Sequence, residues 1–378
     1  MTAPDVVVVG GGPVGLAAAI ALRLRGVEVL VADRARPPID KPCGEGLMPD
    51  GVAALNRLGI TSNFAGALPF RGIRFKEGDA AAEGCFSGGH GLGIRRTALH
   101  QRMIDRAAEI GVVMRWGDAV RVADRDGVEI GGRRISSRWV IGADGRESSV
   151  RRWAGLRHPT VTRRRIGLRQ HFRIAPWTDL VEVQWHDRGQ AVVTPLAGDE
   201  ICVSLFASDA GSRFPDLVNL FPALHQRLLG AAALSAARGA ISGSSVMRSV
   251  VAKQVALIGD AAGAVDALTG EGLAVGFKHA IVLADAIAKD NLREYERAHR
   301  RISRPPELMA KLMLLVGGRH SVRHRVLNAL AAQPRLFTYM LGVHGGGMPV
   351  TAAPLGAIGG FLRHLITAEP LVQSPVAK

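Results

Sequence analysis

Hydrophobic positions near the start of the chain come in short runs separated by glycine. Residues Asp5–Val9 form an almost unbroken β-branched run, which is typical of a strand buried on both faces. After a glycine-rich turn, Pro13–Arg25 is apolar and carries proline in its first turn, where a helix tolerates it. Val27–Val31 is a second apolar run, closed by Asp33. The pattern predicts a strand–helix–strand unit within the first 33 residues.

The middle of the chain moves between helical and strand-like spacing. Arg96–Ile110 places Leu99, Met103 and Ala107 on one helical face, and Val112–Ile141 predicts short strands and turns. Four later segments have strand character and indicate an inserted antiparallel sheet: Ile166–Ile174, Leu180–Trp185, Ala191–Pro195 and Ile201–Phe206.

The last third of the chain returns to longer apolar periods. Val255–Ile258 predicts another buried strand, and Leu273–Ala288 predicts another helix. From Arg304 onward the spacing is mostly helical and apolar, with basic residues interspersed. This pattern predicts helices over the C-terminal region.

The composition is that of an ordered globular protein. The 378 residues are 47% hydrophobic and 21% charged. The net charge of +15 raises the question of nucleic-acid binding. The basic residues are nevertheless dispersed, and the densest cluster, Arg163–Arg165, lacks the interleaved aromatic residues that stack on bases. We therefore expect no nucleic-acid partner, while attraction to an acidic membrane surface or an anionic substrate stays open.

The cysteines and the N-terminus bear on the compartment. Three cysteines are too few for a disulfide scaffold and odd in number, which fits a reducing compartment. The apolar stretch Val6–Leu24 lacks the basic flank of a secretory signal and is divided by a glycine turn and Pro13, so we expect neither export nor a membrane span. A cytoplasmic location is predicted, with peripheral membrane association and the oligomeric state left open.

The first glycine turn carries the fingerprint of a dinucleotide site. In Gly10-x-Gly12-x-x-Gly15 the first glycine permits a tight turn, the second lets the backbone approach a pyrophosphate, and the third allows close helix–strand packing. Pro13 begins a helix whose N-terminal N–H groups point at that anion. Asp33 stands 18 residues after Gly15, where an acidic side chain hydrogen-bonds a ribose hydroxyl.

Two later glycine-bearing segments extend this site. Gly142–Gly145 follows one predicted strand, and Gly259–Gly263 follows another. Asp260 is placed to bind ribityl hydroxyls, although an aspartate in a turn is often only a turn former. Thr269–Gly272 opens a helix whose N–H groups would face the pyrimidine end of a flavin and stabilise its reduced, negatively charged form. In this order the three segments indicate FAD.

These segments resemble those of the p-hydroxybenzoate-hydroxylase-like flavoproteins over residues 1–300. That family includes aromatic hydroxylases, geranylgeranyl reductases and flavin-dependent halogenases. The resemblance assigns Arg96, in an Arg-x-x-Leu pattern, to a flavin phosphate, and Asp144-Gly145 to FAD and NAD(P)H handling. No second glycine fingerprint is present, so NAD(P)H is expected only as a transient reductant. Cofactor contacts are predicted at Gly10, Gly12, Pro13, Gly15, Asp33, Arg34, Arg96, Asp144, Gly145, Gly259, Asp260, Gly270 and Gly272.

The resemblance implies an α/β fold in which a Rossmann-like FAD-binding lobe is assembled from discontinuous segments. We expect that lobe at residues 1–67, 90–155 and 251–303. A mainly antiparallel β-sheet substrate lobe is expected at residues 68–89 and 156–250, and a helical C-terminal region at residues 304–378.

Two segments, Lys41–Leu47 and Asp266–Leu273, resemble the geranylgeranyl-reductase branch of the family. In the second, Ala267 replaces the usual proline. Prenyl reductases of this branch carry a Tyr-x-Trp-x-Phe-Pro box where this chain has Gln190–Pro195, and only the proline is shared. The Trp-x-Trp-x-Ile-Pro signature of the halogenases is absent from the sequence. The resemblance alone therefore does not predict prenyl reduction for this chain, and halogenation is disfavoured.

Three side chains are candidates for contact with a substrate. Cys43 lies in the loop that the resemblance places against the flavin, where a thiol either donates a proton or simply fills the turn. Glu45, in the same loop, is a candidate proton relay or a solvated carboxylate. His171 shares a strand face with Arg169 and Arg173 and is a candidate acid–base group or a hydrogen-bonded sheet histidine. No zinc-type ligand spacing and no metal site is expected.

The expected function is that of an FAD-dependent monooxygenase that hydroxylates a hydrophobic phenolic or polyketide-like small molecule, using NAD(P)H and O₂. Hydroxylation is the commonest task of this fold, and the prenyl-reductase box is missing. One alternative is a flavin-dependent ene-reductase of prenyl or polyenyl chains, which Cys43 and Thr269–Leu273 favour. Another is a flavoprotein that modifies a protein partner. A requirement for O₂ separates hydroxylase from reductase.

Overall fold

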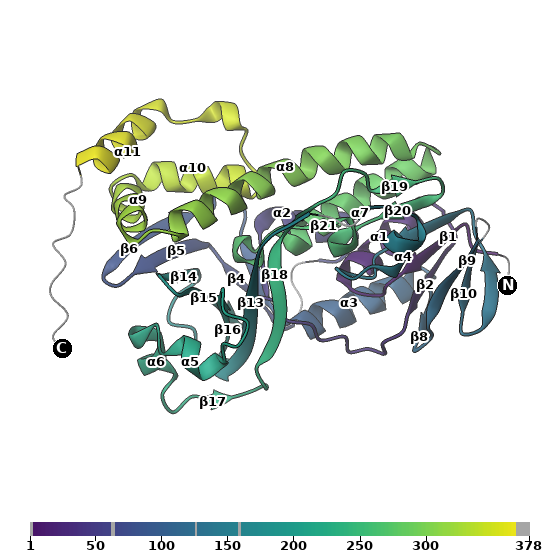
Figure 1. Cartoon of the computed structure of the whole chain (residues 1–378), viewed down its shortest axis with the longest axis horizontal. Coiled ribbons are helices and arrows are strands. Elements are labelled where there is room, and N and C mark those ends of the chain that lie inside the picture. The colour runs from purple at the N-terminus through teal and green to yellow at the C-terminus, as the bar shows by residue number, and fades with distance from the viewer. Residues whose placement is uncertain (1–2, 62–64, 125–126, 158–159, 368–378) are drawn as a thin grey trace.

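The computed structural model describes residues 3–61, 65–124, 127–157 and 160–367. Figure 1 shows two sheet-based parts side by side, with the C-terminal helices running along one edge of both. Residues 368–378, the end of the predicted helical region, lie outside the described residues.

A six-stranded, mainly parallel sheet forms the first part. In spatial order its strands are β19 (Val251–Ala252), β20 (Val255–Leu257), β12 (Trp139–Gly142), β1 (Val6–Val9), β2 (Val29–Asp33) and β8 (Val113–Trp116). Strand β1 pairs in parallel with β2 and β12, and β12 pairs in parallel with β20, so three distant parts of the sequence lie side by side. All four valines of β1 are buried, as expected for a strand covered on both faces.

Two helices that follow glycine turns pack directly on each other beside this sheet. They are α1 (Pro13–Arg23) and α7 (Gly272–Ala288), and α3 (Arg96–Glu109) also packs on α1. Gly276 makes the close approach of α1 and α7 possible, because a Cβ atom there would lie 2.5 Å from Cγ2 of Val14.

A larger, mainly antiparallel sheet forms the second part. In spatial order its strands are β21 (Gly263–Ala264), β18 (Arg238–Val246), β13 (Thr160–Arg173), β16 (Glu200–Ala207), β15 (Gly189–Leu196), β14 (Leu180–His186), β5 (Gly72–Glu77) and β6 (Ala80–Cys85), with β17 (Ala232–Ala233) beside β13. The four predicted strands are present as β13 to β16. Strand β5 pairs in parallel with β14, so residues 72–85 join this sheet. The predicted α/β fold with an antiparallel insertion is confirmed.

Short elements complete the two parts. Two three-stranded sheets contain β3 (Gly46–Leu47), β7 (Gly91–Ile94) and β4 (Ala67–Phe70), and β11 (Arg133–Ser136), β10 (Gly127–Ile130) and β9 (Val120–Asp124). The short helices are α2 (Pro49–Arg57), α4 (Ser149–Trp153), α5 (Phe214–Val218), α6 (Pro222–Leu228) and the 3-10 turns Gly259–Ala262, Ala267–Thr269 and Val350–Ala352.

The C-terminal region consists of α8 (Leu292–Gly317), α9 (His320–Ala332), α10 (Pro334–His344) and α11 (Leu355–Thr367). Helix α8 begins well before Arg304, where the sequence predicted helical spacing to start, and it continues through two prolines that resemble a break. Helices α9 and α10 pack on the β5–β6 hairpin. None of the helices in the described ranges combines the length and apolarity needed to cross a membrane.

A buried arginine fastens α9 to that hairpin. Arg323 of α9 is 1% exposed, and its Nε donates to Oε1 of Glu77 at 2.8 Å. Its guanidinium also donates to the carbonyl of Gly317 at 2.8 Å and to Oδ1 of Asp187 at 2.7 Å. Of the Glu77 and Asp187 carboxylates, only that of Glu77 is largely buried. The Asp187 side chain is 67% exposed.

We expect Arg323→Met to lower the free energy of unfolding by about 3–5 kcal/mol, because it leaves the buried Glu77 carboxylate without its main counter-charge. Asp187→Asn, the control on the exposed partner, should cost less than about 1 kcal/mol. Urea unfolding of both variants measures the difference. Equal costs would show that burial of Glu77 does not matter here.

Candidate active site

A cavity of about 1190 Å³ lies between the two sheets and the C-terminal helices. Gly10, Asp33 and Arg96 line one end of it, where the glycine turn precedes α1. Apolar side chains such as Phe75 of β5 and Phe337 of α10 line the other end. One continuous space therefore joins the predicted cofactor turn to an apolar chamber.

Backbone packing explains two of the three glycines in the first turn. Gly10 has φ +111°, and a Cβ atom there would lie 2.3 Å from the carbonyl oxygen of Ala143. A Cβ atom at Gly15 would lie 1.9 Å from the carbonyl oxygen of Gly10. At Gly12, by contrast, the nearest atom is Nη2 of Arg96 at 4.0 Å. The protein itself therefore leaves the space in front of Gly12 open.

That open space has the properties of a pyrophosphate site. It lies at the N-terminus of α1, whose unpaired N–H groups favour an anion. Arg96 lines the cavity, and its Nε is buried without a hydrogen-bond partner among the described residues. A buried guanidinium nitrogen without a partner is costly in an empty site and is satisfied by a phosphate oxygen. The residues present thus fit the phosphates of FAD.

Two side chains hold the glycine turn in shape. Asp33 accepts from the backbone N–H of Gly11 through Oδ2 at 2.8 Å and from Ala35 through Oδ1 at 2.8 Å. Nε2 of the buried His100 donates to the carbonyl of Gly11 at 2.7 Å. Burial lowers the pKa of His100. His100 was missed in the sequence, where only its spacing of one helical turn from Arg96 could have drawn attention to it.

The middle glycine segment is shaped mainly by its aspartate. Asp144 accepts from the backbone N–H groups of Ser149 at 2.7 Å and Val150 at 3.2 Å, and from the hydroxyl of Ser148 at 2.5 Å. Asp144 therefore caps helix α4, and it also lines the cavity together with Gly145. The structure adds this capping role, while a contact of Asp144 with a cofactor stays a prediction.

The remaining predicted contacts all lie at the cavity. Asp260 is exposed and lines it without any hydrogen bond that would occupy its carboxylate in the described structure. Gly270 has φ +69°, the left-handed conformation that ends the preceding 3-10 turn, and Gly272 begins α7. The other predicted contacts that line the cavity are Pro13, Arg34 and Gly259.

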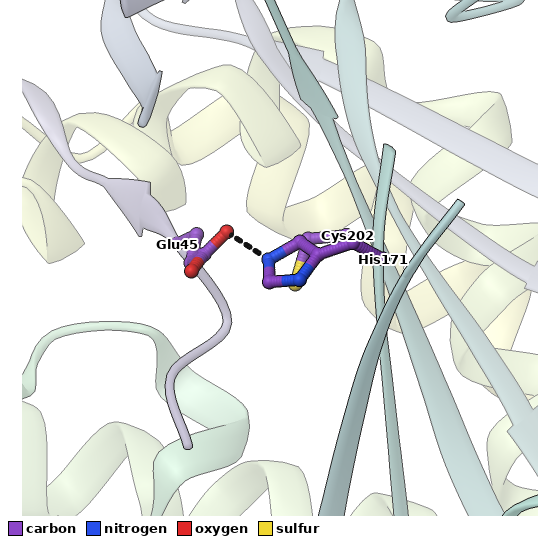
Figure 2. A group of neighbouring side chains, drawn as sticks. All are labelled: Glu45, His171 and Cys202. Carbon is purple, nitrogen blue, oxygen red and sulfur yellow. Dashed lines mark hydrogen bonds and ion pairs between the residues drawn. The ribbon is translucent and has the colours of Figure 1, made fainter. Parts of the chain in front are cut away.

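The loop that carries Cys43 is fixed by a buried glutamate. Glu45 is 3% exposed, so the alternative of a solvated loop carboxylate is wrong. Its Oε1 accepts from the backbone N–H of Arg96 at 3.1 Å, and its Oε2 accepts from Nε2 of His171 at 2.6 Å (Figure 2). Glu45 also adopts φ +59°, an uncommon conformation for a residue with a side chain.

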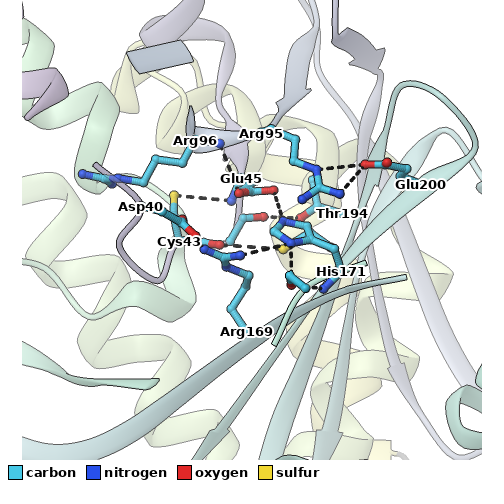
Figure 3. A network of polar contacts seen from close by, with 12 residues as sticks. Asp40, Cys43, Glu45, Arg95, Arg96, Arg169, His171, Thr194 and Glu200 are labelled. Carbon is cyan, nitrogen blue, oxygen red and sulfur yellow. Dashed lines mark hydrogen bonds and ion pairs between the residues drawn. The ribbon is translucent and has the colours of Figure 1, made fainter. Parts of the chain in front are cut away.

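His171 belongs to a polar network of side chains (Figure 3). Nη1 of Arg169 lies 3.0 Å from its Nδ1, and because arginine only donates, Nδ1 accepts. The proton on Nε2 is the one that Glu45 accepts. Arg169 in turn donates to Asp40 at 2.5 Å. Of the two alternatives for His171, this geometry supports the hydrogen-bonded sheet histidine, and neither His171 nor Glu45 lines the cavity.

Glu45, His171 and Cys202 also place one potential metal ligand each within 4.8 Å of one another. The Arg169 guanidinium against His171 opposes a cation at that point, and burial raises the pKa of the Cys202 thiol. The arrangement therefore favours the hydrogen-bonded network over a metal site. Its effect is to hold the loop so that Cys43 faces the cavity.

A model of the FAD binding domain family matches residues 3–294 of the chain. The chain belongs to this family. The expected resemblance to the p-hydroxybenzoate-hydroxylase-like flavoproteins is confirmed at the level of this superfamily. The protein is an FAD-dependent oxidoreductase, and the expectation of FAD as its cofactor is confirmed.

Proteins similar to this chain are named for several different activities. Menaquinone reductase of Mycobacterium tuberculosis is 30% identical over 326 residues, which are 76% of this chain and 77% of that protein. Rifampicin monooxygenase of Streptomyces venezuelae is 29% identical over 174 residues, which are 41% of this chain and 34% of that protein. Among solved structures, a flavoprotein/dehydrogenase of Cytophaga hutchinsonii has a TM-score of 0.79 at 18% identity, covering 90% of this chain and 92% of that chain. The last shares the fold.

We expect Gly12→Ala to leave the fold intact and to weaken FAD binding roughly tenfold or more, about 1.4 kcal/mol, because its methyl group enters the space for the pyrophosphate. Gly15→Ala should instead lower soluble yield and melting temperature, because its methyl group meets backbone. Flavin fluorescence titration and thermal unfolding separate the two effects. Normal FAD affinity in Gly12→Ala would contradict the assigned pyrophosphate site.

Proposed function

We propose that this FAD-dependent oxidoreductase is a monooxygenase that hydroxylates a hydrophobic phenolic or polyketide-like small molecule, with NAD(P)H as transient reductant and O₂ as oxidant. The observation that carries the proposal is the single cavity that joins the cofactor turn to the apolar chamber. A substrate with a polar ring and an apolar extension matches both ends of that space.

The two ends of the cavity differ in chemistry. Near the Cys43 loop, Arg169, Thr194 and Ser204 line it with polar groups, and the Thr194 hydroxyl donates to the carbonyl of Gly44 at 2.7 Å. Farther away the lining is apolar on both sides, from the sheet and from α8 to α10: Ile73, Val181, Val183, Trp185, Met313 and Leu330. A ring would therefore be oriented by the polar end, and its apolar substituent by the chamber.

Reduced FAD supplies the oxygen chemistry when bound. The contributions of this chain are to hold the cofactor at the glycine turns, to orient the ring beside the Cys43 loop, and to exclude water. The apolar lining from α9 and α10, including the buried Leu327, Leu330 and Phe337, disfavours water in the chamber. An apolar lining limits side reactions of reactive species with water.

A second function, reduction of a double bond in a prenyl or polyenyl chain, has its own support. The similarity to menaquinone reductase extends over 77% of that protein, whereas the similarity to rifampicin monooxygenase covers 34% of that one. Cys43 lines the cavity, where a thiol can donate a proton. Membership of the geranylgeranyl-reductase-like branch belongs to this second proposal.

Oxygen incorporation decides between the two reactions. The purified protein with NAD(P)H is given a panel of alkylated phenols and prenylated quinones under ¹⁸O₂, and the products are analysed by mass spectrometry. A hydroxylase inserts one ¹⁸O atom and makes no product without O₂. A product that gains two hydrogens under anaerobic conditions would overturn the monooxygenase and establish the reductase.

We expect Cys43→Ala to lower turnover less than about tenfold, or roughly 1.4 kcal/mol of barrier. In a hydroxylase the flavin performs the oxygen transfer, so the thiol contributes mainly packing. A positioned proton donor would instead contribute about 10²–10⁴-fold. Steady-state turnover with FAD content held equal is the measurement. A collapse of turnover with FAD bound and still reducible would favour the reductase.

A further inference from the structure

Two buried side chains, Glu271 and His344, face each other at the start of α7. Glu271, which immediately precedes the helix, is 1% exposed. Its Oε2 lies 3.4 Å from Nδ1 of His344, the last residue of α10. Neither Glu271 oxygen nor His344 Nδ1 has a hydrogen-bond partner among the described residues. The proposed function gives these two groups no role.

The surroundings of His344 indicate where its proton lies. Nε2 of His344 is 3.3 Å from the carbonyl oxygen of Thr269. A carbonyl only accepts, so Nε2 carries the hydrogen and Nδ1 presents a lone pair to Glu271. An ionised Glu271 would set its own lone pairs against that nitrogen. A protonated Glu271 instead presents its hydrogen toward a nitrogen that can accept it, 3.4 Å away.

The charges around the pair agree with this arrangement. Burial, with a further contribution from Asp50, raises the pKa of Glu271 well above its usual value. Burial lowers the pKa of His344. Lys278, the nearby cation on α7, lies 2.5 Å from Oδ2 of Asp50 and so already has a carboxylate partner. In the described structure, Asp50 of α2 and Lys278 are the charged groups that act on the pair.

The position of Glu271 makes its charge important for the cavity. An ionised carboxylate at a helix N-terminus cancels much of the positive potential there. Thr269, Gly270 and Gly272 line the cavity at this N-terminus. His344 lines it from α10. The charge of Glu271 therefore sets the potential that α7 presents to the cavity.

We propose that Glu271 and His344 hold one proton between them, and that this neutral pair leaves the positive end of α7 free to stabilise the negative charge of reduced flavin. The inference rests on the proposed placement of the flavin against residues 269–272. Glu271 acts through the helix and is a positioning residue, and it transfers no atom to substrate.

The first test uses the stability of the FAD-saturated protein. The folded-state pKa of Glu271 is raised above its unfolded value, so its protonated form contributes stability that is complete at low pH and is lost as the pH rises toward the folded pKa. Relative to Glu271→Gln, the unfolding constant of the wild type should rise by up to about tenfold per pH unit above the pKa of an unfolded glutamate, and this rise should level off above the folded pKa. Glu294→Gln, which removes an exposed carboxylate on α8, should show no such trend. A ratio that does not change with pH for Glu271→Gln overturns the proposal.

The second test uses the midpoint potential of the bound flavin, measured against redox dyes. Below the pH at which the ratio of unfolding constants levels off, the wild type and Glu271→Gln should have the same midpoint potential, because both are neutral at this position. Above that pH, the wild-type potential should fall below that of the variant. A difference below that pH, or agreement above it, overturns the proposal.

His344→Gln provides a second variant if Glu271→Gln does not fold. This substitution replaces the accepting Nδ1 by an amide that can donate a hydrogen bond to an ionised Glu271. The ionised form is then stabilised, so the pH at which the midpoint potential begins to fall below that of Glu271→Gln should be lower. If that pH stays unchanged, the shared proton is overturned. These readouts require bound FAD but neither substrate nor oxygen insertion, so they can fail independently of the proposed monooxygenase activity.

Discussion

The carboxylate of Glu45 connects three parts of the molecule that the active site requires in fixed relation. It joins the loop after β2, the start of α3 at Arg96, and the large sheet at His171. The backbone carbonyl of Glu45 also accepts from the backbone N–H of Ile94 at 2.9 Å. The left-handed backbone conformation at Glu45 costs about 1–3 kcal/mol and persists because these contacts determine it. Together with the hydrogen bond from Thr194 to the carbonyl of Gly44, this junction fixes the position of the Cys43 loop against the cofactor turn.

Buried ions recur where the two sheet-based parts meet. Arg169 pairs with Asp40, and Arg165 pairs with Asp266 while its guanidinium lies over the ring of Phe206. Taking such groups out of water is costly unless each finds a partner. These ion pairs fix the position of the two sheets relative to each other. The apolar chamber beyond them contributes only its size and shape. Different residues of one cavity therefore orient a substrate and provide the space for it.

Much of this arrangement could be predicted from the sequence, because it depends on local signals. The glycine turn, Pro13 and Asp33 follow from short-range backbone chemistry, and the four strands of the insertion follow from alternation. Individual side-chain contacts between distant segments could not be predicted. His100 supports the glycine turn from another element, and the meeting of Glu271 with His344 depends on where α10 ends.

Two local features of the sequence do not reveal their full structural role. The prolines of α8 resemble a boundary, yet the helix passes through them because its apolar face is buried on both sides of that point. Asp144 belongs to a motif associated with the cofactor, yet most of its hydrogen bonds go to the N-terminus of α4. For α8 the outcome depends on tertiary packing, whereas for Asp144 it depends on a local turn that brings residues 148–150 back to its carboxylate.

The division of the cavity wall has an evolutionary consequence. The end that receives the cofactor is built from segments spread over the first three quarters of the chain, and each is constrained by backbone contacts such as that between Gly15 and Gly10. Much of the opposite wall comes from three consecutive helices near the C-terminus. Substitutions at the apolar lining positions of those helices change the size and shape of the chamber and leave the glycine turns in place. New substrates can therefore be acquired by drift in one contiguous stretch of the gene, while selection on the remainder preserves the redox machinery.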